Sequence, residues 1–287
     1  MNTITVSPIA GIDLKDVSQF LHTNLNSKIP VKTWRDSFHS QWSQSVPNFG
    51  FQLKNGGDLV GVICAIYSDQ IIDGKIEFLC NPHSWCVLKD YRKQSINLVL
   101  AVLQQKGYHF TMFTPNPDVA TVFRYLKFKD LSNIQTLYLH HPSVTRWLPK
   151  SIIISDLEKM KNILHGNDLK VFNDHSHLGW LKHIVFGHKD ELCHVIYKTS
   201  IFKKLSCANI LYISNAHFFE KYHSLLSHYF FISEHIFLSI VDARFLDSKP
   251  KTTFTLINNQ PKLFLSESLD DKEIKNVYSE LMALDLM

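Results

Sequence analysis

Residues 87–103 place a strand, a basic turn and a helix in direct succession, and this order constrains the fold more than any other part of the sequence. Val87 ends an apolar strand, Arg92 and Lys93 lie in a turn-forming segment, and residues 98–103 form an apolar helical run. The first N–H groups of a helix lack carbonyl partners within it, and the positive end of the helix dipole lies there. The junction therefore predicts a binding site for an anionic group such as a pyrophosphate.

Strands and helices alternate through residues 3–140. The turn Asn55-Gly56-Gly57-Asp58 between two apolar stretches predicts a β-hairpin. Asn116 before Pro117 predicts a capped helix start, and Gly107 predicts the end of the preceding helix. We expect strands at 3–9, 49–54, 59–68, 77–79, 85–87, 109–114, 128–131 and 136–139, and helices from residue 13, around 34–42, and at 98–103 and 117–126.

The strand–turn–helix segment resembles the acetyl-CoA loop of the GCN5-related N-acetyltransferase (GNAT) superfamily, whose pattern reads V-x-x-x-Y-R-G-x-G-I-G/A-x-x-L. Five positions match this pattern: Val87, Tyr91, Arg92, Ile96 and Leu100. Two of the pattern's glycines are Ser95 and Asn97 here. Both replacements are small and polar, so backbone donation to a phosphate remains sterically possible, although glycine leaves a more open approach.

A second segment, residues 116–128, resembles the GNAT pattern N-x-x-A-x-x-L-Y-x-K-x-G-F without a gap. The tyrosine of the pattern falls on Phe123 and its glycine on Lys127. Two motifs in the right order support each other more than either does alone. The resemblance covers about residues 3–140 and implies an α/β fold built on an α+β mixed sheet.

The resemblance implies acetyl-CoA, or another acyl-CoA, as a co-substrate. The residues that it assigns to cofactor binding are Val87, Leu88, Arg92, Lys93, Gln94, Ser95, Ile96, Asn97, Asn116 and Phe123.

Acyl transfer needs a group that deprotonates the attacking amine or hydroxyl. Glu77 and His83 are the candidates, because they lie near the strands that would flank the acyl group. Each is equally consistent with a surface carboxylate or a turn histidine. The family tyrosine that protonates the leaving thiolate is absent, since Phe123 cannot serve as an acid, although positioning alone carries much of acyl transfer from a thioester.

The second half repeats the alternation in a weaker form. We expect helices at 154–164, 217–229 and 270–284, and strands at 194–198, 209–214, 236–243 and 262–265. The turn from Ser214 to His217 has neither the glycines nor the basic residues of a phosphate loop. We therefore predict two GNAT-like domains, an acyl-CoA-binding domain at 1–142 and a degenerate domain at 150–287 that contributes to a substrate cleft, joined by a linker at 143–149.

Other kinds of site have little support. The motif Cys80-x-x-His83-x-x-Cys86 has no second ligand pair nearby, so we assign no metal. The five cysteines lack the spacing of a disulfide framework, and the first residues lack the pattern of a secretory signal. We therefore expect a cytoplasmic protein with no membrane span.

The function that these observations favour is acyl-CoA-dependent acyl transfer, most simply of acetyl, to an amine or hydroxyl of a small metabolite such as an amino sugar. Two alternatives remain open. One is a non-catalytic GNAT-like binding module, and the other is a peptidyl-type transferase that uses aminoacyl-tRNA. The net charge of only +4 argues against tRNA and DNA as partners. The sequence does not indicate an oligomeric state.

Overall fold

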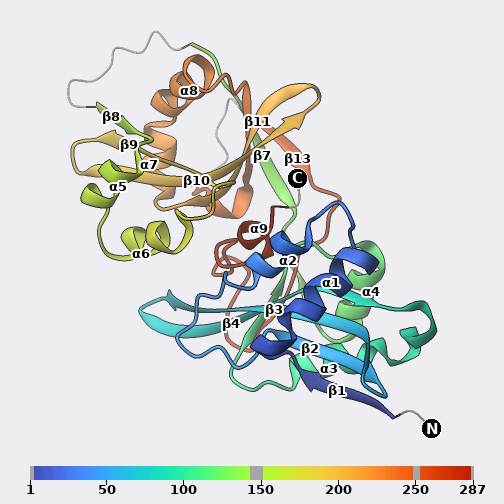
Figure 1. Ribbon diagram of the computed structural model, residues 1–287. Helices are drawn as coiled ribbons and strands as arrows, with labels where there is room; N and C mark the ends of the chain where they lie inside the picture. The colour runs from blue at the N-terminus through green and yellow to red at the C-terminus, as the bar shows by residue number, and fades with distance from the viewer. Residues whose placement is uncertain (1–2, 143–150, 248–252, 286–287) are drawn as a thin grey trace. The chain divides into compact units, whose positions relative to one another are not determined.

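The computed structural model describes residues 3–142, 151–247 and 253–285 (Figure 1). The predicted linker at 143–149 lies outside these residues. The chain forms two compact units. The first comprises residues 1–131, 261–274 and 278–284, and the second comprises residues 132–260, 275–277 and 285–287.

The first unit is built on a seven-stranded mixed sheet with the order β1-β2-β3-β4-β5-β14-β6, in which only β4 and β5 are paired in parallel. Its strands are β1 (Ile4–Pro8), β2 (Gly50–Asn55), β3 (Asp58–Ile72), β4 (Lys75–Val87), β5 (His109–Met112), β6 (Lys129–Asp130) and β14 (Leu263–Leu265). Its helices are η1 (Gly11–Asp13), α1 (Leu14–Asn24), α2 (Val31–Ser37), η2 (Lys89–Gln94), α3 (Ser95–Leu103), α4 (Pro117–Tyr125) and α9 (Glu280–Ala283).

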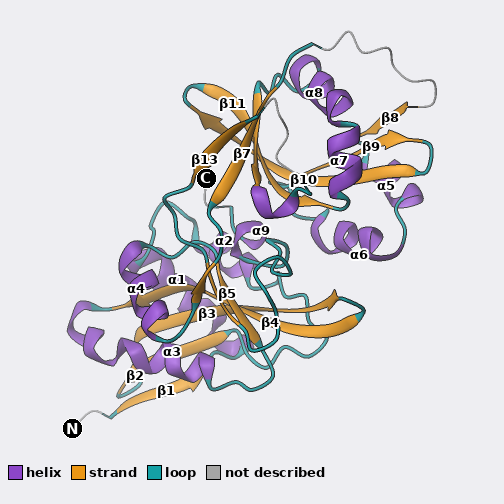
Figure 2. Cartoon of the chain, turned by 180° about the vertical axis from the view of Figure 1, so that it is seen from behind, coloured by secondary structure: helices purple, strands orange, loops and turns teal. Residues whose placement is uncertain are grey.

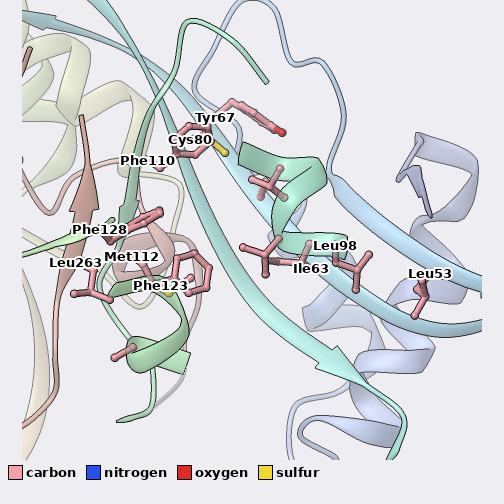
Figure 3. Close-up of a cluster of buried hydrophobic side chains, with 14 of the residues drawn as sticks. Leu53, Ile63, Tyr67, Cys80, Leu98, Phe110, Met112, Phe123, Phe128 and Leu263 are labelled. Carbon is pink, nitrogen blue, oxygen red and sulfur yellow. The ribbon is translucent and has the colours of Figure 1, made fainter. Parts of the chain in front are cut away.

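Strand β3 is buried on both faces, because helices cover both sides of this sheet. One set of alternate β3 residues, including Ile63 and Tyr67, packs with Leu98 of α3 and Phe123 of α4 in one hydrophobic cluster (Figure 3). The other set, including Val62, is also buried, and α1 contacts β3 and β4. Figure 1 shows α1 and α2 in front of the sheet. A strand buried on both faces reads as a continuous apolar run, which is the pattern of residues 59–67.

The predicted hairpin is confirmed. β2 and β3 pair up to Asn55 opposite Asp58, and the turn residues Gly56 and Gly57 have φ values of 60° and 109°. Such left-handed conformations at both central positions favour glycine, which explains the sequence of this turn.

Lys127 occupies the position of the family glycine and has a φ of 72°. It follows α4, where the Lys127 N–H donates to the Arg124 carbonyl (3.0 Å) and the Phe128 N–H donates to the Phe123 carbonyl (3.1 Å). This hydrogen-bond pattern ends a helix with one left-handed residue, for which glycine is preferred. A lysine there is strained.

Replacing Lys127 with glycine should therefore stabilise the protein. A left-handed conformation costs a residue with a Cβ about 1–2 kcal/mol, and the greater freedom of glycine in the unfolded chain offsets about half of this gain. We expect Lys127→Gly to raise the free energy of unfolding by about 0.5–1 kcal/mol in urea titrations. Lys127→Ala is the control and should give no gain. A glycine variant less stable than the parent would contradict this account.

The second unit is also built on a seven-stranded mixed sheet, with the order β13-β7-β12-β11-β10-β9-β8. Figure 2 labels all of these strands except β12. Its strands are β7 (Ile134–Leu139), β8 (Ser151–Ile154), β9 (Lys182–His188), β10 (Glu191–Phe202), β11 (Leu205–Ile213), β12 (Leu238–Asp242) and β13 (Phe254–Ile257). Its helices are α5 (Leu157–Ile163), α6 (Gly166–His175), α7 (Ala216–Lys221), α8 (His223–Ile232) and η3 (Ala243–Phe245). From β8 to β12 the order of elements repeats that from β1 to β5.

Each sheet takes one strand from the other half of the sequence. β7, which we expected to finish the first sheet, lies in the second sheet between β12 and β13. β14, near the C-terminus, lies in the first sheet between β5 and β6. Accordingly, the N-terminal stretch of the first unit ends at residue 131, whereas the predicted domain ended at 142. The unit also includes residues 261–274 and 278–284. Alternation of apolar residues identifies a strand but not its partner, so the sequence pattern could not reveal this exchange.

The helix predicted at 270–284 is wrong. Only Glu280–Ala283 is helical, and Tyr278 has a φ of 60°, which breaks a helix. The apolar residues that suggested the helix, among them Ile274 and Val277, are buried, but so are the polar residues Asn276 and Glu280. A segment buried on several sides mimics the periodicity of an amphipathic helix. The helix predicted at 217–229 is interrupted at Tyr222, between α7 and α8.

Candidate functional site

The strands β4 and β5 separate at one end of the first unit. Their parallel ladder holds two residue pairs, Leu79 with His109 and Cys80 with Phe110. Beyond these pairs, β5 hydrogen-bonds to β14 on its other side, while β4 continues to Val87 without a parallel neighbour in the described part of the chain. We call the divergence of residues 81–87 from residues 111–114 the β4–β5 fork. Along the fork, the edge of β4 opposite β3 has no strand partner among the described residues, and residues 84–87 are partly exposed.

A β-bulge lies within the fork. Cys64 of β3 pairs with His83 and Val62 pairs with Cys86, so that Ser84 and Trp85 together oppose one β3 residue. Ser84 has a φ of 50°. A bulge bends its strand and redirects side chains, and such features recur next to functional sites.

Trp85 directs its ring toward α4. Its ring and that of Phe123 are arranged edge to face, with centroids 6.2 Å apart, and Phe123 itself is completely buried. Phe123 therefore belongs to the hydrophobic core beside the fork, together with Phe128 and Met112 (Figure 3). Where the family motif has a tyrosine, this chain therefore has a buried phenylalanine, which has no proton to donate.

Glu280, from α9, lies at the base of the fork. Its carboxyl Oε1 accepts hydrogen bonds from the N–H of Phe113 (2.8 Å), the N–H of Thr114 (3.0 Å) and the hydroxyl of Thr114 (3.1 Å). The residue is 1% exposed, and burial raises the pKa of its carboxyl above the ordinary value. The other oxygen, Oε2, is buried and has no hydrogen-bond partner among the described residues.

Asn81 joins the two strands at the same place. Its side-chain amide donates to the carbonyl of Thr111 (2.9 Å) on β5, and its Oδ1 accepts from the backbone N–H of Glu280 (2.8 Å). The side chain is almost completely buried. Asn81 thus fixes both the opening of the fork and the backbone position of Glu280.

The two base candidates from the sequence lie in different surroundings. His83 is in the fork, 8% exposed, with Nδ1 3.0 Å from the Ser84 hydroxyl, and burial lowers the pKa of its ring to about 4. Glu77 precedes the fork on β4, and its carboxylate is 3.0 Å from Nε2 of His109. The other ring nitrogen of His109 is 2.8 Å from the Ser266 hydroxyl, so Glu77 belongs to a network at the paired end of the strands.

The basic segment after β4 forms η2 and runs directly into α3. Arg92, Lys93 and Asn97 are exposed, whereas Val87, Leu88 and Ile96 pack against the hydrophobic cluster. The N–H and hydroxyl of Ser95 both point to the Arg92 carbonyl, the hydroxyl at 2.7 Å. The Arg92 charge also acts on the thiol of Cys86, where it partly offsets the rise in pKa that burial causes. The positive charge therefore lies close to the end of β4.

Gln94 and Asn116 complete the residues that the sequence assigned to the cofactor. Gln94 is half-buried, and its Oε1 has no hydrogen-bond partner among the described residues. Asn116 is exposed and caps α4, as predicted, because its Oδ1 accepts from the N–H of Val119 (2.9 Å) and Pro117 follows it. The described residues contain no group of three His, Cys, Asp or Glu side chains able to hold a metal ion.

The second unit differs from the first at the ends of β11 and β12, which correspond to β4 and β5. β11 leads into α7, whose start is capped by its own Asn215, which accepts from the Phe218 N–H at 2.8 Å. At the end of β12 the buried side chains of Asp242 and Arg244 form an ion pair (2.8 Å), and Arg244 also donates to Asn276 (3.2 Å). At the ends of β11 and β12, the polar side chains thus pair with groups of the protein itself.

Solved structures share this fold. A GCN5-related N-acetyltransferase from Anabaena variabilis aligns with a TM-score of 0.60 at 11% identity, over 91% of this chain and 72% of that one. A probable N-acyltransferase from Enterococcus faecalis gives 0.59 at 13% identity, over 92% and 72%. A fungal glucosamine N-acetyltransferase region, part of a multi-domain β-N-acetylglucosaminidase, gives 0.58 at 12% identity, over 92% and 38%.

The fold is accordingly that of the GNAT acetyltransferases, and the two mixed sheets give a tandem GNAT-like arrangement, which confirms the fold class expected from the sequence. No known protein-family profile matches the sequence, and no curated protein sequence is similar to it. Among the described residues no helix is long and apolar enough to cross a membrane.

Glu280 and Asn81 were missed by the sequence reasoning. Asn81 lies within an extended segment beside a proline, where the pattern suggested an interruption of the strand. Glu280 lies 166 residues from Thr114, within the segment that was expected to be one helix. A burial pattern that places a carboxylate among apolar residues becomes visible only in three dimensions.

Proposed function

We propose that the protein is an acyl-CoA-dependent N-acyltransferase, most simply an acetyltransferase, that acts on a small amine. The observation that carries this proposal is the β4–β5 fork, with its bulge at Ser84 and Trp85, followed by a basic segment that leads into α3. The fork offers unpaired β4 backbone to the amide-bearing pantetheine arm. Arg92 and Lys93 are exposed cations at the end of that strand and suit the pyrophosphate.

For the acceptor, we propose an amino sugar. The resemblance to the fungal glucosamine N-acetyltransferase region supports this choice, and a net charge of +4 gives no support for a large polyanionic acceptor such as tRNA. The neutral amine attacks the thioester carbonyl, the C–S bond breaks, and the amine loses one proton while the CoA thiolate gains one.

A non-catalytic acyl-CoA-binding module is the second candidate. The observation that favours it is Phe123, which is fully buried where the family motif has a tyrosine, and which has no proton for the leaving thiolate. Release of free CoA distinguishes the two candidates, because a binding module retains affinity for acetyl-CoA without turnover.

Charge reversal tests the cofactor site. In the variant Arg92→Glu with Lys93→Glu, two carboxylates replace the cations that face the phosphates, and calorimetry should show acetyl-CoA affinity at least 100-fold lower. Lys203→Glu with Lys204→Glu is the matched control. It makes the same charge change at two adjacent exposed lysines of the second unit and should leave the affinity within about threefold. Equal affinity of both variants would rule out the proposed site.

A further inference from the structure

Glu280 is arranged unlike a carboxylate that serves only to hold the fold together. The three donors from Phe113 and Thr114 converge on Oε1, while Oε2 is buried without a partner in the described part of the chain. A buried polar atom without a hydrogen bond costs about 1–3 kcal/mol, and a structural carboxylate would lower this cost by pairing both oxygens. The arrangement fixes the orientation of the carboxyl group and leaves Oε2 without a hydrogen bond.

The place of Glu280 in the fork is the second observation. Glu280 is bound to Phe113 and Thr114 at the end of β5 and to Asn81 of β4, so its carboxyl lies where the two strands begin to diverge. The basic segment lies at the far end of β4, from residue 89 onward. A pantetheine arm that starts at this segment and follows β4 into the fork brings its thioester toward Asn81 and Glu280.

We propose that Glu280 is the catalytic base of the first unit, and that its Oε2 accepts the proton of the attacking amine. The nitrogen forms a bond to the thioester carbonyl carbon as its proton passes to Oε2. The C–S bond then breaks, and the proton held by Glu280 is returned to the CoA thiolate, directly or through solvent. The products are an amide and free CoA, and the carboxylate is regenerated.

The electrostatics of the site suit this role. Burial raises the pKa of the Glu280 carboxyl, and the groups that counteract this rise are uncharged: the backbone N–H groups of Phe113 and of Glu280 itself, and the side chains of Asn81 and Thr114. A carboxylate whose pKa is raised by burial accepts a proton more readily than an exposed one. The hydrogen bonds to Oε1 hold the carboxyl group in place at the end of β5.

This inference rests on the proposed function and adds a structural consequence. The base comes from residues 278–284, which the first unit takes from the C-terminal end of the chain together with β14. A site that consists only of the N-terminal stretch would lack its base. Neither Glu77 nor His83 is needed as the proton acceptor.

The test is the variant Glu280→Gln in the full-length protein. Glutamine keeps an oxygen that accepts from Phe113 and Thr114, so acetyl-CoA affinity by calorimetry should stay within threefold. Release of CoA thiol, measured with acetyl-CoA and glucosamine, or with water as the acceptor, should fall 100-fold or more at unchanged KM for acetyl-CoA. The acid limb of the kcat profile should also disappear. Glu267→Gln, at an exposed glutamate of the same unit, is the matched control and should leave kcat within twofold.

Two results would overturn the inference. One is a Glu280→Gln variant whose kcat and pH profile equal those of the parent while Glu77→Gln abolishes turnover. The other is a Glu280→Gln variant that loses acetyl-CoA affinity together with turnover, which would assign the residue to binding or folding. Both results differ from a failure of the proposed function itself, in which the parent protein neither binds acetyl-CoA nor releases CoA thiol.

Discussion

At pH 5 the protein is expected to be unfolded, whereas at pH 7.5 it is folded. Five histidines are each less than one-tenth exposed: His83, His140, His175, His183 and His194. Burial is the main cause that lowers their pKa values, to about 4 for three of them (His83, His175 and His183), to about 3 for His140, and well below the ordinary value for His194. Each of these rings is therefore neutral in the folded protein and becomes protonated preferentially in the unfolded chain.

The sign and the size of the effect follow from proton linkage. Below pH 6.5 the unfolded chain binds more protons than the folded protein, so the free energy of unfolding falls as the pH falls, until the folded-state pKa values are reached. For a pKa of about 4 the loss at pH 5 is about 2 kcal/mol for each histidine. The five groups together lose about 10 kcal/mol, which is comparable to the whole stability of a typical domain.

Tryptophan fluorescence and circular dichroism between pH 8 and pH 4 measure this transition. The stacked pair His183 and His194, whose Nδ1 and Nε2 are 3.1 Å apart, provides the matched variants. Replacing both with leucine should move the transition to lower pH, whereas His165→Gln, at an exposed position of the same unit, should not move it. A parent protein that stays folded at pH 4 would show that the buried rings are not the determinants of acid stability.

Replacing Arg244 with methionine should cost about 3–5 kcal/mol of stability, because it removes the guanidinium that pairs with a buried carboxylate. The Asp242 and Arg244 side chains are 3% and 4% exposed, and both Nε and Nη2 of the guanidinium donate to the carboxylate, at 3.0 and 2.8 Å. The double variant Asp242→Leu with Arg244→Met removes both charges and should be more stable than Arg244→Met alone.

A surface pair of the same kind is the control for this prediction. Arg124 and Asp130 are also bidentate, with Nη2 2.6 Å from Oδ1, but their side chains are 43% and 57% exposed. Arg124→Met should therefore cost no more than about 1 kcal/mol in the same urea titration. Equal losses at the two sites would mean that burial does not determine the energy of these ion pairs.

Local features of the fold could be predicted from the sequence where a residue type is required by a backbone conformation or a hydrogen bond. Gly56 and Gly57 identified the hairpin turn, and Asn116 with Pro117 identified the start of α4, because each of these residues satisfies a specific geometric demand. The element order through α4 follows from such signals and from apolar periodicity.

Long-range features of the fold could not be predicted in the same way. Asn81 and Glu280 are 199 residues apart, and the exchange of β7 and β14 depends on which strand edges meet, which no local pattern encodes. The loop residues Arg92 to Asn97 could be placed on a strand–helix junction, but their role toward a cofactor is a proposal that depends on the fork beside them.

The crystal structure of the protein with acetyl-CoA tests the central claim most directly. The account predicts one acetyl-CoA in each chain, with its pyrophosphate against residues 92–97, its pantetheine arm along residues 81–87, and its thioester beside Oε2 of Glu280. Density for acetyl-CoA at the end of β11 in the second unit, with an empty β4–β5 fork, would contradict the account.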